Sequence, residues 1–370
     1  MTGRFVILSA FAGAVALLSV SSCVKVETDG ETVPANAISY QVVNCNMKSP
    51  DVEAPSTRAG ATVFDDKSTF ISGAYHLPEG RTWDADKDGA IVYISPVEIS
   101  KAGNVWKDKD NVYYWPESGS LTFFAYTPSG LAQASGTGNG VSITTSGVSY
   151  KGWKAYGDNL ECDFMVAVPA KDKSSNLHEY YSDGVPMLFK HKLTQIQFVA
   201  FVEKDDPDND VYIEKLTLTN IYSSGDYTQA GSDEGAWCNR TSPAEYVLFE
   251  TESPVKLTTS ETKLMPEGLE TMLMLPQNLS ALAAADENIG VERSTPKIVI
   301  SYYQGTTNKA DRKEGSIKFT DIRSYLWAMG TSVKYSISFG DTGNPILFNP
   351  SVNEWADGQG IGLIVGGGTE

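Results

Sequence analysis

Residues 186–201, PMLFKHKLTQIQFVAF, lie at the middle of the 370-residue chain, and their pattern decides how we divide it. The apolar side chains fall first on odd and then on even positions, at Met187, Phe189, Leu193, Ile196, Phe198 and Ala200. Alternation is typical of a β-strand, and its shift by one near Thr194 and Gln195 indicates a bulge or bend. A helix fits part of the pattern, but the Ser-Asp-Gly turn signal before Pro186 favours a strand. We therefore predict one long strand that opens a second β domain.

Short alternating runs separated by turn residues also make up the rest of the chain, and no long helix is indicated. In the first half these runs occupy residues 90–94, 111–115 and 121–126. Many short strands with frequent turn signals are the pattern of a sandwich or a barrel. The sequence therefore predicts an all-β protein.

Two runs in the second half carry more detail. Residues 333–339 alternate apolar and polar side chains throughout, which predicts a half-buried strand. The apolar positions of residues 211–218 change phase by one at Glu214 and Lys215, directly after an acidic turn. This change predicts a β-bulge.

The length of the chain allows two domains with separate cores. The polar run at residues 171–184 carries little apolar surface, so we expect it to be the linker. The N-terminal domain then takes residues 23–184, and the C-terminal domain takes residues 185–370.

The composition is that of folded protein, with 41% hydrophobic and 20% charged residues. The 29 basic and 46 acidic side chains give a formal net charge of -17. This balance argues against nucleic acid or an anionic membrane surface as a partner, because both attract positive charge.

Residues 1–22 resemble an export signal. Arg4 precedes an uncharged run at residues 5–20, which is too short to span a bilayer, and small residues follow before Cys23. Such a cysteine is the lipid attachment site of a bacterial lipoprotein, where acyl chains such as palmitate anchor the protein to the outer membrane. The alternative is an ordinary secretory signal with an incidental cysteine.

The remaining cysteines and the histidines indicate no metal site. Cys45, Cys162 and Cys238 cannot all pair within one chain, and their spacing fits no zinc pattern. We expect isolated thiols or one optional bridge. His76 and His178 stand alone, and the third histidine, in the central stretch, is expected to be a satisfied core residue.

Residues 84–89 carry the D-x-D-x-D-G start of a calcium loop, formed by Asp84, Asp86, Asp88 and Gly89. The twelfth position is Ser95 instead of a bidentate glutamate, so an acidic turn is favoured over a calcium site. Elsewhere no nucleophile motif, zinc motif or phosphate-binding glycine loop stands in the required strand-to-helix context. We therefore predict a protein without a cofactor and without catalysis.

Arg58 stands in a proline-containing run at residues 49–60 that has no apolar periodicity. It follows an expected half-buried strand marked by Ile38, Tyr40 and Val42. An arginine in an exposed loop is a cleavage site for a trypsin-like protease. On the residues alone, a solvated arginine without a role is the favoured alternative.

A set of short motifs resembles the fimbrillin family, the lipoprotein pilus subunits of Bacteroidales-type bacteria. The motifs span residues 115–128, 163–167, 189–198, 275–277, 327–335 and 352–355, in the order of the family. The resemblance implies two transthyretin-like β-sandwich domains in tandem. It also implies a structural fimbrial or adhesin subunit at the cell surface, whose partners are other fimbrillin subunits and, as a further possibility, a host or bacterial surface ligand.

The resemblance also implies a role for Arg58. Family members are exported as lipoproteins and cut by an arginine-specific protease after the first strand, so that a strand of another subunit replaces it. Processing at Arg58 then becomes the favoured interpretation. Ile361, Leu363 and Val365 alternate as a donor strand requires, although the tail after Trp355 is short, so the chain is a stalk, a tip or an accessory anchor subunit.

A surface lipoprotein that binds glycans is the alternative function. Aromatic side chains stack on sugar rings, and four tryptophans would then form an exposed platform: Trp83, Trp106, Trp153 and Trp237. Aromatic residues more often belong to a core. Exposure of two or more of them on one face would favour this alternative.

The lipid anchor can be tested at Cys23. Cys23→Ala should abolish incorporation of a fatty-acid probe and move the protein from membranes to the soluble fraction, because the cleaved signal can no longer anchor it. Cys45→Ala is the matched control and should keep its label. Unchanged labelling of Cys23→Ala would end the lipoprotein interpretation.

Overall fold

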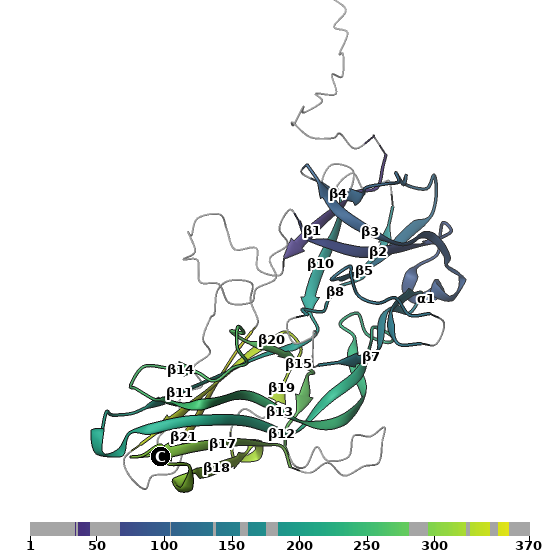
Figure 1. The fold of residues 1–370 in the computed structure, drawn as a ribbon. Helices are drawn as coiled ribbons and strands as arrows, with labels where there is room; N and C mark the ends of the chain where they lie inside the picture. Colours follow the sequence, from purple (N-terminus) through teal and green to yellow (C-terminus); the bar gives the residue numbers. More distant parts are fainter. Residues whose placement is uncertain are drawn as a thin grey trace, which may run out of the picture.

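A computed structural model describes residues 34, 36–44, 67–103, 105–135, 138–155, 162–174, 184–280, 295–322, 326–340 and 347–354 (Figure 1). These ranges hold β-strands, one short helix α1 (Trp83–Asp86) and several 3-10 turns. The predicted all-β class is confirmed. No helix in the described part of the chain is long and apolar enough to cross a membrane.

The first sheet closes on itself. Each strand pairs with the next, in the order β2 (Thr69–Leu77), β3 (Ile91–Ala102), β4 (Val105–Asp108), β1 (Tyr40–Asn44), β10 (Val185–His191), β8 (Met165–Ala167) and β5 (Ser120–Thr127). The last of these, β5, pairs back with β2, and β9 (Ala170–Lys173) also pairs with β5, at other residues than β8 does. Only the β1–β10 pairing in this ring is parallel.

Two further sheets form the second half of the molecule (Figure 1). One holds β14 (Thr262–Lys263), β11 (Thr194–Val202), β20 (Thr331–Phe339) and β21 (Leu347–Glu354), with β15 (Met272–Met274) on β11. The other holds β18 (Lys313–Lys318), β17 (Lys297–Gln304), β12 (Val211–Thr228), β7 (Gly147–Lys154) and β6 (Gly140–Thr144), with β13 (Ala236–Lys256) on β12. A short pair joins β16 (Gln277–Asn278) to β19 (Leu326–Trp327).

The central stretch is two strands instead of the predicted one. β10 ends at His191 and belongs to the first sheet, whereas β11 begins at Thr194 and belongs to another. The phase shift in the sequence therefore marks the point where the chain changes sheets, because each strand must turn its apolar side to a different core. The division of the chain at residue 184 stays a prediction.

Two other details of the sequence pattern can be compared with the strands. The predicted bulge is confirmed, since the register of β12 shifts between Ile213 and Lys215 against both β13 and β17. The predicted strand at residues 111–115 is wrong: this segment makes one isolated bridge, between Tyr114 and Ala37.

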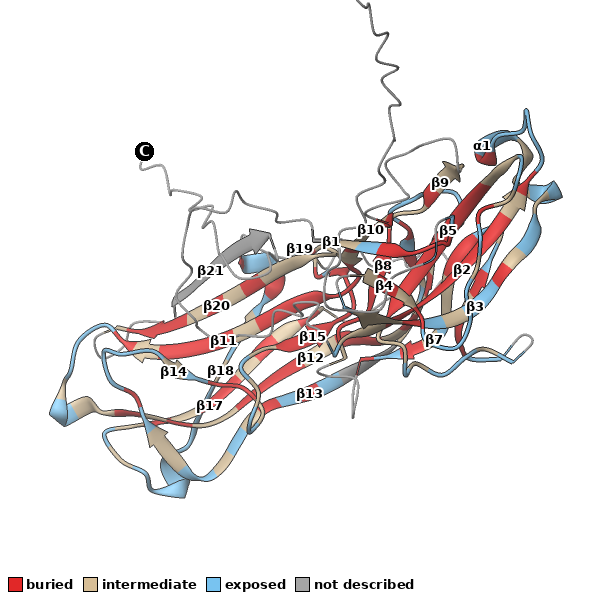
Figure 2. Ribbon diagram, turned by 90° about the horizontal axis from the view of Figure 1, so that it is seen from above, coloured by how far each residue is buried: buried red, intermediate tan, exposed pale blue. Residues whose placement is uncertain are grey.

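Strands β2 and β5 serve two cores. On β2, Phe70 and Ala74 face the inside of the closed sheet, while Ile71 and Leu77 face outward into a second core. This outer face is covered by β6, β7 and the end of the β12–β13 hairpin, so both sides of the two strands are buried (Figure 2). The two halves of the molecule thus share one continuous core cluster.

The tip of the β12–β13 hairpin is bound by polar contacts to β7, to β8 of the first sheet and to the crossover after β10. The buried side chain of Gln229 accepts a hydrogen bond from the Val148 backbone at 2.9 Å and donates to the Ala167 carbonyl at 3.0 Å. The Trp237 indole donates to the Lys192 carbonyl at 2.5 Å. These bonds hold the crossover between β10 and β11 against the hairpin.

Gln229→Ala should lower the free energy of unfolding by about 2–3 kcal/mol, because it leaves a buried N–H and a buried carbonyl without partners. Urea denaturation measures this loss. Gln304→Ala is the control, since Gln304 accepts only from Lys313 at the surface and should lose less than about 0.5 kcal/mol. Equal losses in the two variants would show that Gln229 does not join the halves.

Candidate functional site

The candidate site is the slot in the first sheet that residues 36–44 fill. On one side of the slot β1 runs parallel to β10, from the pair Tyr40–Val185 onward. On the other side it meets β4 at a single pair with Trp106. The segment is therefore held mainly by one neighbouring strand, along its C-terminal half.

Backbone hydrogen bonds fix the first half of the segment. The Ile38 N–H donates to the Tyr113 carbonyl at 2.7 Å, and the Trp115 N–H donates to the Asn36 carbonyl at 3.1 Å. The Val185 N–H donates to the Ser39 carbonyl at 2.8 Å and starts the pairing with β10. Residues 113–115, although not a strand, thus line the slot opposite β10.

The side chains of the segment enter the core of the closed sheet. Ile38 and Tyr40 are buried, and the Tyr40 ring packs edge-on against Phe70 and Phe123 at 5.7 and 5.8 Å between centroids. Burial raises the pKa of the Tyr40 phenol above its usual range, so the group stays neutral. The slot is suited to an uncharged strand with large alternating side chains.

Gly184 makes the closest approach to the segment. Its backbone has a φ of +83°, and a Cβ added there would lie 2.7 Å from the Tyr40 carbonyl carbon and 2.9 Å from that of Ser39. Only glycine therefore fits beside the seated strand. Sequence reasoning used this glycine as a turn signal and missed its contact with residues 39–40, because the partner lies far away in the chain.

The predicted processing and attachment residues lie outside the described residues. This applies to Cys23, Arg58, Ile361, Leu363 and Val365, and the structure therefore leaves their roles as predictions.

The tryptophan platform of the glycan-binding alternative does not exist. Trp83, Trp106, Trp153 and Trp237 are exposed by only 3%, 6%, 0% and 5% and belong to the two cores. Their rings contact other aromatic side chains inside the protein, since core packing recovers far more apolar area than a surface position does.

The acidic turn at residues 84–89 is occupied by ion pairs. Asp84 pairs with Lys171 at 2.8 Å, and Asp86 pairs with Arg81 at 2.7 Å and accepts from the Thr82 N–H at 3.1 Å. The two carboxylates thus pair with different cations and do not form the ligand set of a calcium loop. Within the described residues no group of three acidic, histidine or cysteine side chains could hold a metal ion.

The other single candidates lie in the interior. Nδ1 of the buried His191 lies 3.0 Å from a carboxylate oxygen of Asp163, as expected for a satisfied core histidine. Cys162 and Cys238 form no disulfide with each other, and Cys45 lies outside the described residues. Burial raises the pKa of the Cys162 thiol to about 11, so the thiol remains protonated and unreactive near neutral pH.

The family assignment rests on a family model. Residues 57–355 match the model described as fimbrillin-like, and the chain therefore belongs to this family. It is a structural protein and not an enzyme. No curated protein matches the chain.

Two solved structures can be compared with this chain at low sequence identity. A fimbrial protein from Bacteroides vulgatus is 16% identical in sequence and gives a TM-score of 0.54. The match covers 86% of this chain and 99% of that protein. A candidate cell adhesion protein from Bacteroides uniformis is 14% identical, with a TM-score of 0.48, 87% of this chain covered and 100% of that one. The likeness to the first of these supports the fold described above.

Gly184→Ala should loosen the seated strand. Gly268 has the same φ of +83° with nothing within 4 Å of an added Cβ, so Gly268→Ala isolates the cost of the backbone conformation, about 1–2 kcal/mol. Gly184→Ala should lose more stability than this control and speed hydrogen exchange at residues 36–44. Identical losses with unchanged exchange would mean that the close approach does not hold the strand.

Proposed function

We propose that this chain is a fimbrial or adhesin subunit that assembles by exchange of its N-terminal strand for a strand of another subunit. The carrying observation is that residues 36–44 fill a slot between β10 and residues 113–115 and complete a closed sheet. Arg58 lies between this strand and β2 in the chain, so one cut there separates the strand covalently from the rest of the subunit.

Export as a lipoprotein attached at Cys23 would precede this step, and the protein would reach the outer membrane before processing. The motifs of the sequence and the fimbrillin-like family support this order. We also infer that the closed sheet and the two further sheets correspond to the two transthyretin-like domains of the family. The division lies near residue 184, except that β6 and β7 of the N-terminal part join a sheet of the second half.

The energetics of the seated strand support replacement instead of simple loss. Removing the buried side chains of Ile38 and Tyr40 from the core costs on the order of 3–5 kcal/mol, which is comparable to the lower range of a whole domain's stability. An empty slot would also expose the backbone edge of β10. Residues 36–44 therefore leave the slot slowly, or they leave at the same time as another strand enters.

A donor strand must offer ladder hydrogen bonds and large side chains at alternate positions. Ile361, Leu363 and Val365 have the same two-residue spacing as Ile38, Tyr40 and Val42. The C-terminal tail of a second copy is therefore the proposed donor. Other fimbrillin subunits with a comparable tail are equally suitable partners.

Arg58→Ala should remain monomeric after treatment with an arginine-specific protease, whereas the wild-type protein should form filaments visible by electron microscopy. Arg81→Ala is the matched control, because it removes an exposed arginine from the folded part and should still assemble. Filaments formed equally well by Arg58→Ala would falsify the processing model.

The donor can be tested separately. A peptide of residues 359–368 added to cleaved protein should raise its melting temperature, because it refills the slot. A peptide with Asp at positions 361, 363 and 365 should not. A cleaved protein that the first peptide does not stabilise would exclude this tail as the donor while leaving cleavage at Arg58 open.

A further inference from the structure

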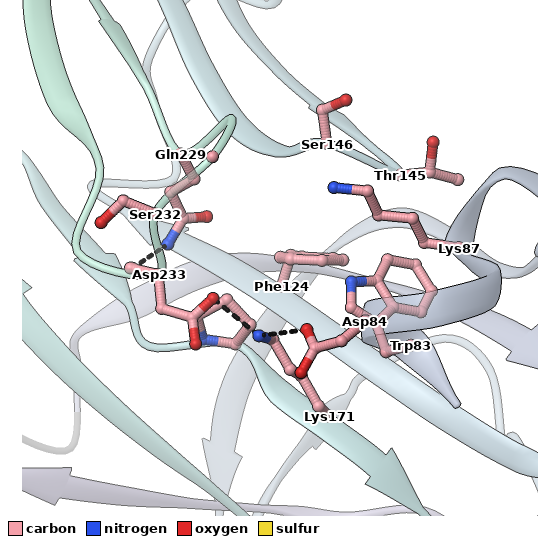
Figure 3. A pocket seen from close by; sticks show the side chains of 12 residues that line it. Trp83, Asp84, Lys87, Phe124, Thr145, Ser146, Lys171, Gln229, Ser232 and Asp233 are labelled. Carbon is pink, nitrogen blue, oxygen red and sulfur yellow. Dashed lines mark hydrogen bonds and ion pairs between the residues drawn. The ribbon is translucent and has the colours of Figure 1, made fainter.

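A pocket of about 360 Å³ lies where the two halves of the molecule meet. It is lined by helix α1 and the turn after it, the β6–β7 turn, strand β9 and the tip of the β12–β13 hairpin (Figure 3). This volume is at the lower end of the range for ligand pockets and fits one sugar ring with its substituents.

Side-chain donors that have no hydrogen-bond partner among the described residues line this pocket. The ammonium of Lys87 points into it, and among the described residues Lys87 has no ion-pair partner (Figure 3). Thr145 and Ser146 line the same pocket, and the indole nitrogen of Trp83 lies on its other side, below Lys87 in the view of Figure 3. Lys87 therefore brings into the pocket a positive charge that no ion pair among the described residues offsets, and this charge favours an anionic group.

The opposite side of the pocket is an ion triad. Lys171 lies 2.8 Å from Asp84 and 2.9 Å from Asp233 (Figure 3). Burial lowers the pKa of Lys171, but the hydrogen bonds to Asp233 and Asp84 outweigh it and raise the pKa above the usual value. The triad is held charged, and the free carboxylate lone pairs can accept hydrogen bonds from hydroxyl groups.

We propose that this pocket binds an acidic sugar residue. Its carboxylate would pair with Lys87 and accept a hydrogen bond from the Trp83 indole, while its ring hydroxyls would bond to the carboxylates of Asp84 and Asp233. The assignment goes beyond subunit assembly, because the pocket is separate from the slot filled by residues 36–44.

Other anions fit the pocket less well. A phosphate carries its charge on every face and would bring some of it toward the two aspartates, whereas a sugar acid offers neutral hydroxyls on that side. A small carboxylate such as acetate would meet Lys87 but leave the triad without new partners. The separation of donors and acceptors across the pocket therefore favours a ligand that is charged at one end only.

Isothermal titration calorimetry of the full chain with glucuronate and glucose tests the proposal, because the two sugars share a ring and differ in charge at C6. Glucuronate should bind about tenfold or more tightly, the expected effect of a hydrogen-bonded charge. Lys87→Gln should lower the affinity for glucuronate to that for glucose. Lys109→Gln, an exposed lysine outside the pocket, should leave binding unchanged.

Three results would overturn the proposal: equal binding of glucuronate and glucose, unchanged binding to Lys87→Gln, or acetate binding as tightly as glucuronate. Trp83→Phe keeps an aromatic ring but removes the indole N–H. This variant should weaken glucuronate binding without preventing folding, which a melting curve checks.

An oligosaccharide that ends in glucuronate distinguishes the two sources of a sugar acid, the end of a glycan and the free acid. Binding of both ligands assigns the pocket to glycan ends, and binding of the free acid alone assigns it to a free sugar acid.

Discussion

The closed sheet depends on a strand that enters from far away in the sequence. The neighbours of residues 36–44 in the ring are β10 and β4, and β10 and β4 do not pair with each other. Without the segment, the polar backbone edge of β10 and the aromatic core behind Tyr40 would meet water, and both exposures are unfavourable. The slot must be filled, but nothing in its chemistry requires that the filling strand belong to the same chain.

The rest of the architecture makes this slot rigid. Because β2 and β5 bury side chains on both faces, a distortion of the closed sheet would also disturb the core shared with β6, β7 and the β12–β13 hairpin. The crossover at Lys192 is tied to this hairpin through Trp237, and Lys190 at the end of β10 pairs with Glu234. The hairpin thus holds β10, the strand that borders the slot. The slot can therefore keep its shape if another strand replaces residues 36–44.

The sequence pattern predicted the local features well and the long-range ones poorly. Alternation identified the all-β class, the strand at residues 333–339 and the bulge beside Glu214, because each depends on neighbouring side chains. It could not show that β7 pairs with β12, since that pairing joins residues far apart in the chain. The phase shift near Thr194 was interpreted as a bulge within one strand, whereas the chain changes sheets there. The sequence does not separate the two cases, because a change of sheet and a bulge produce the same shift. The segment at residues 111–115 looked like a strand because it is apolar, yet its role is to border the slot.

Covalent linkage explains why processing and exchange belong together in the proposed function. While residues 45–66 connect β1 to the rest of the subunit, the strand is present at a high effective concentration, and an external strand of similar affinity cannot compete. A cut at Arg58 makes both strands intermolecular ligands, and their relative affinity and concentration then decide which one occupies the slot. Because β1 meets β4 at only one pair, a longer donor that pairs with both β4 and β10 would gain hydrogen bonds that the resident strand lacks. The short pairing of β1 is therefore what the proposed exchange requires, because the strand must be held strongly enough for the subunit to fold and weakly enough to be replaced.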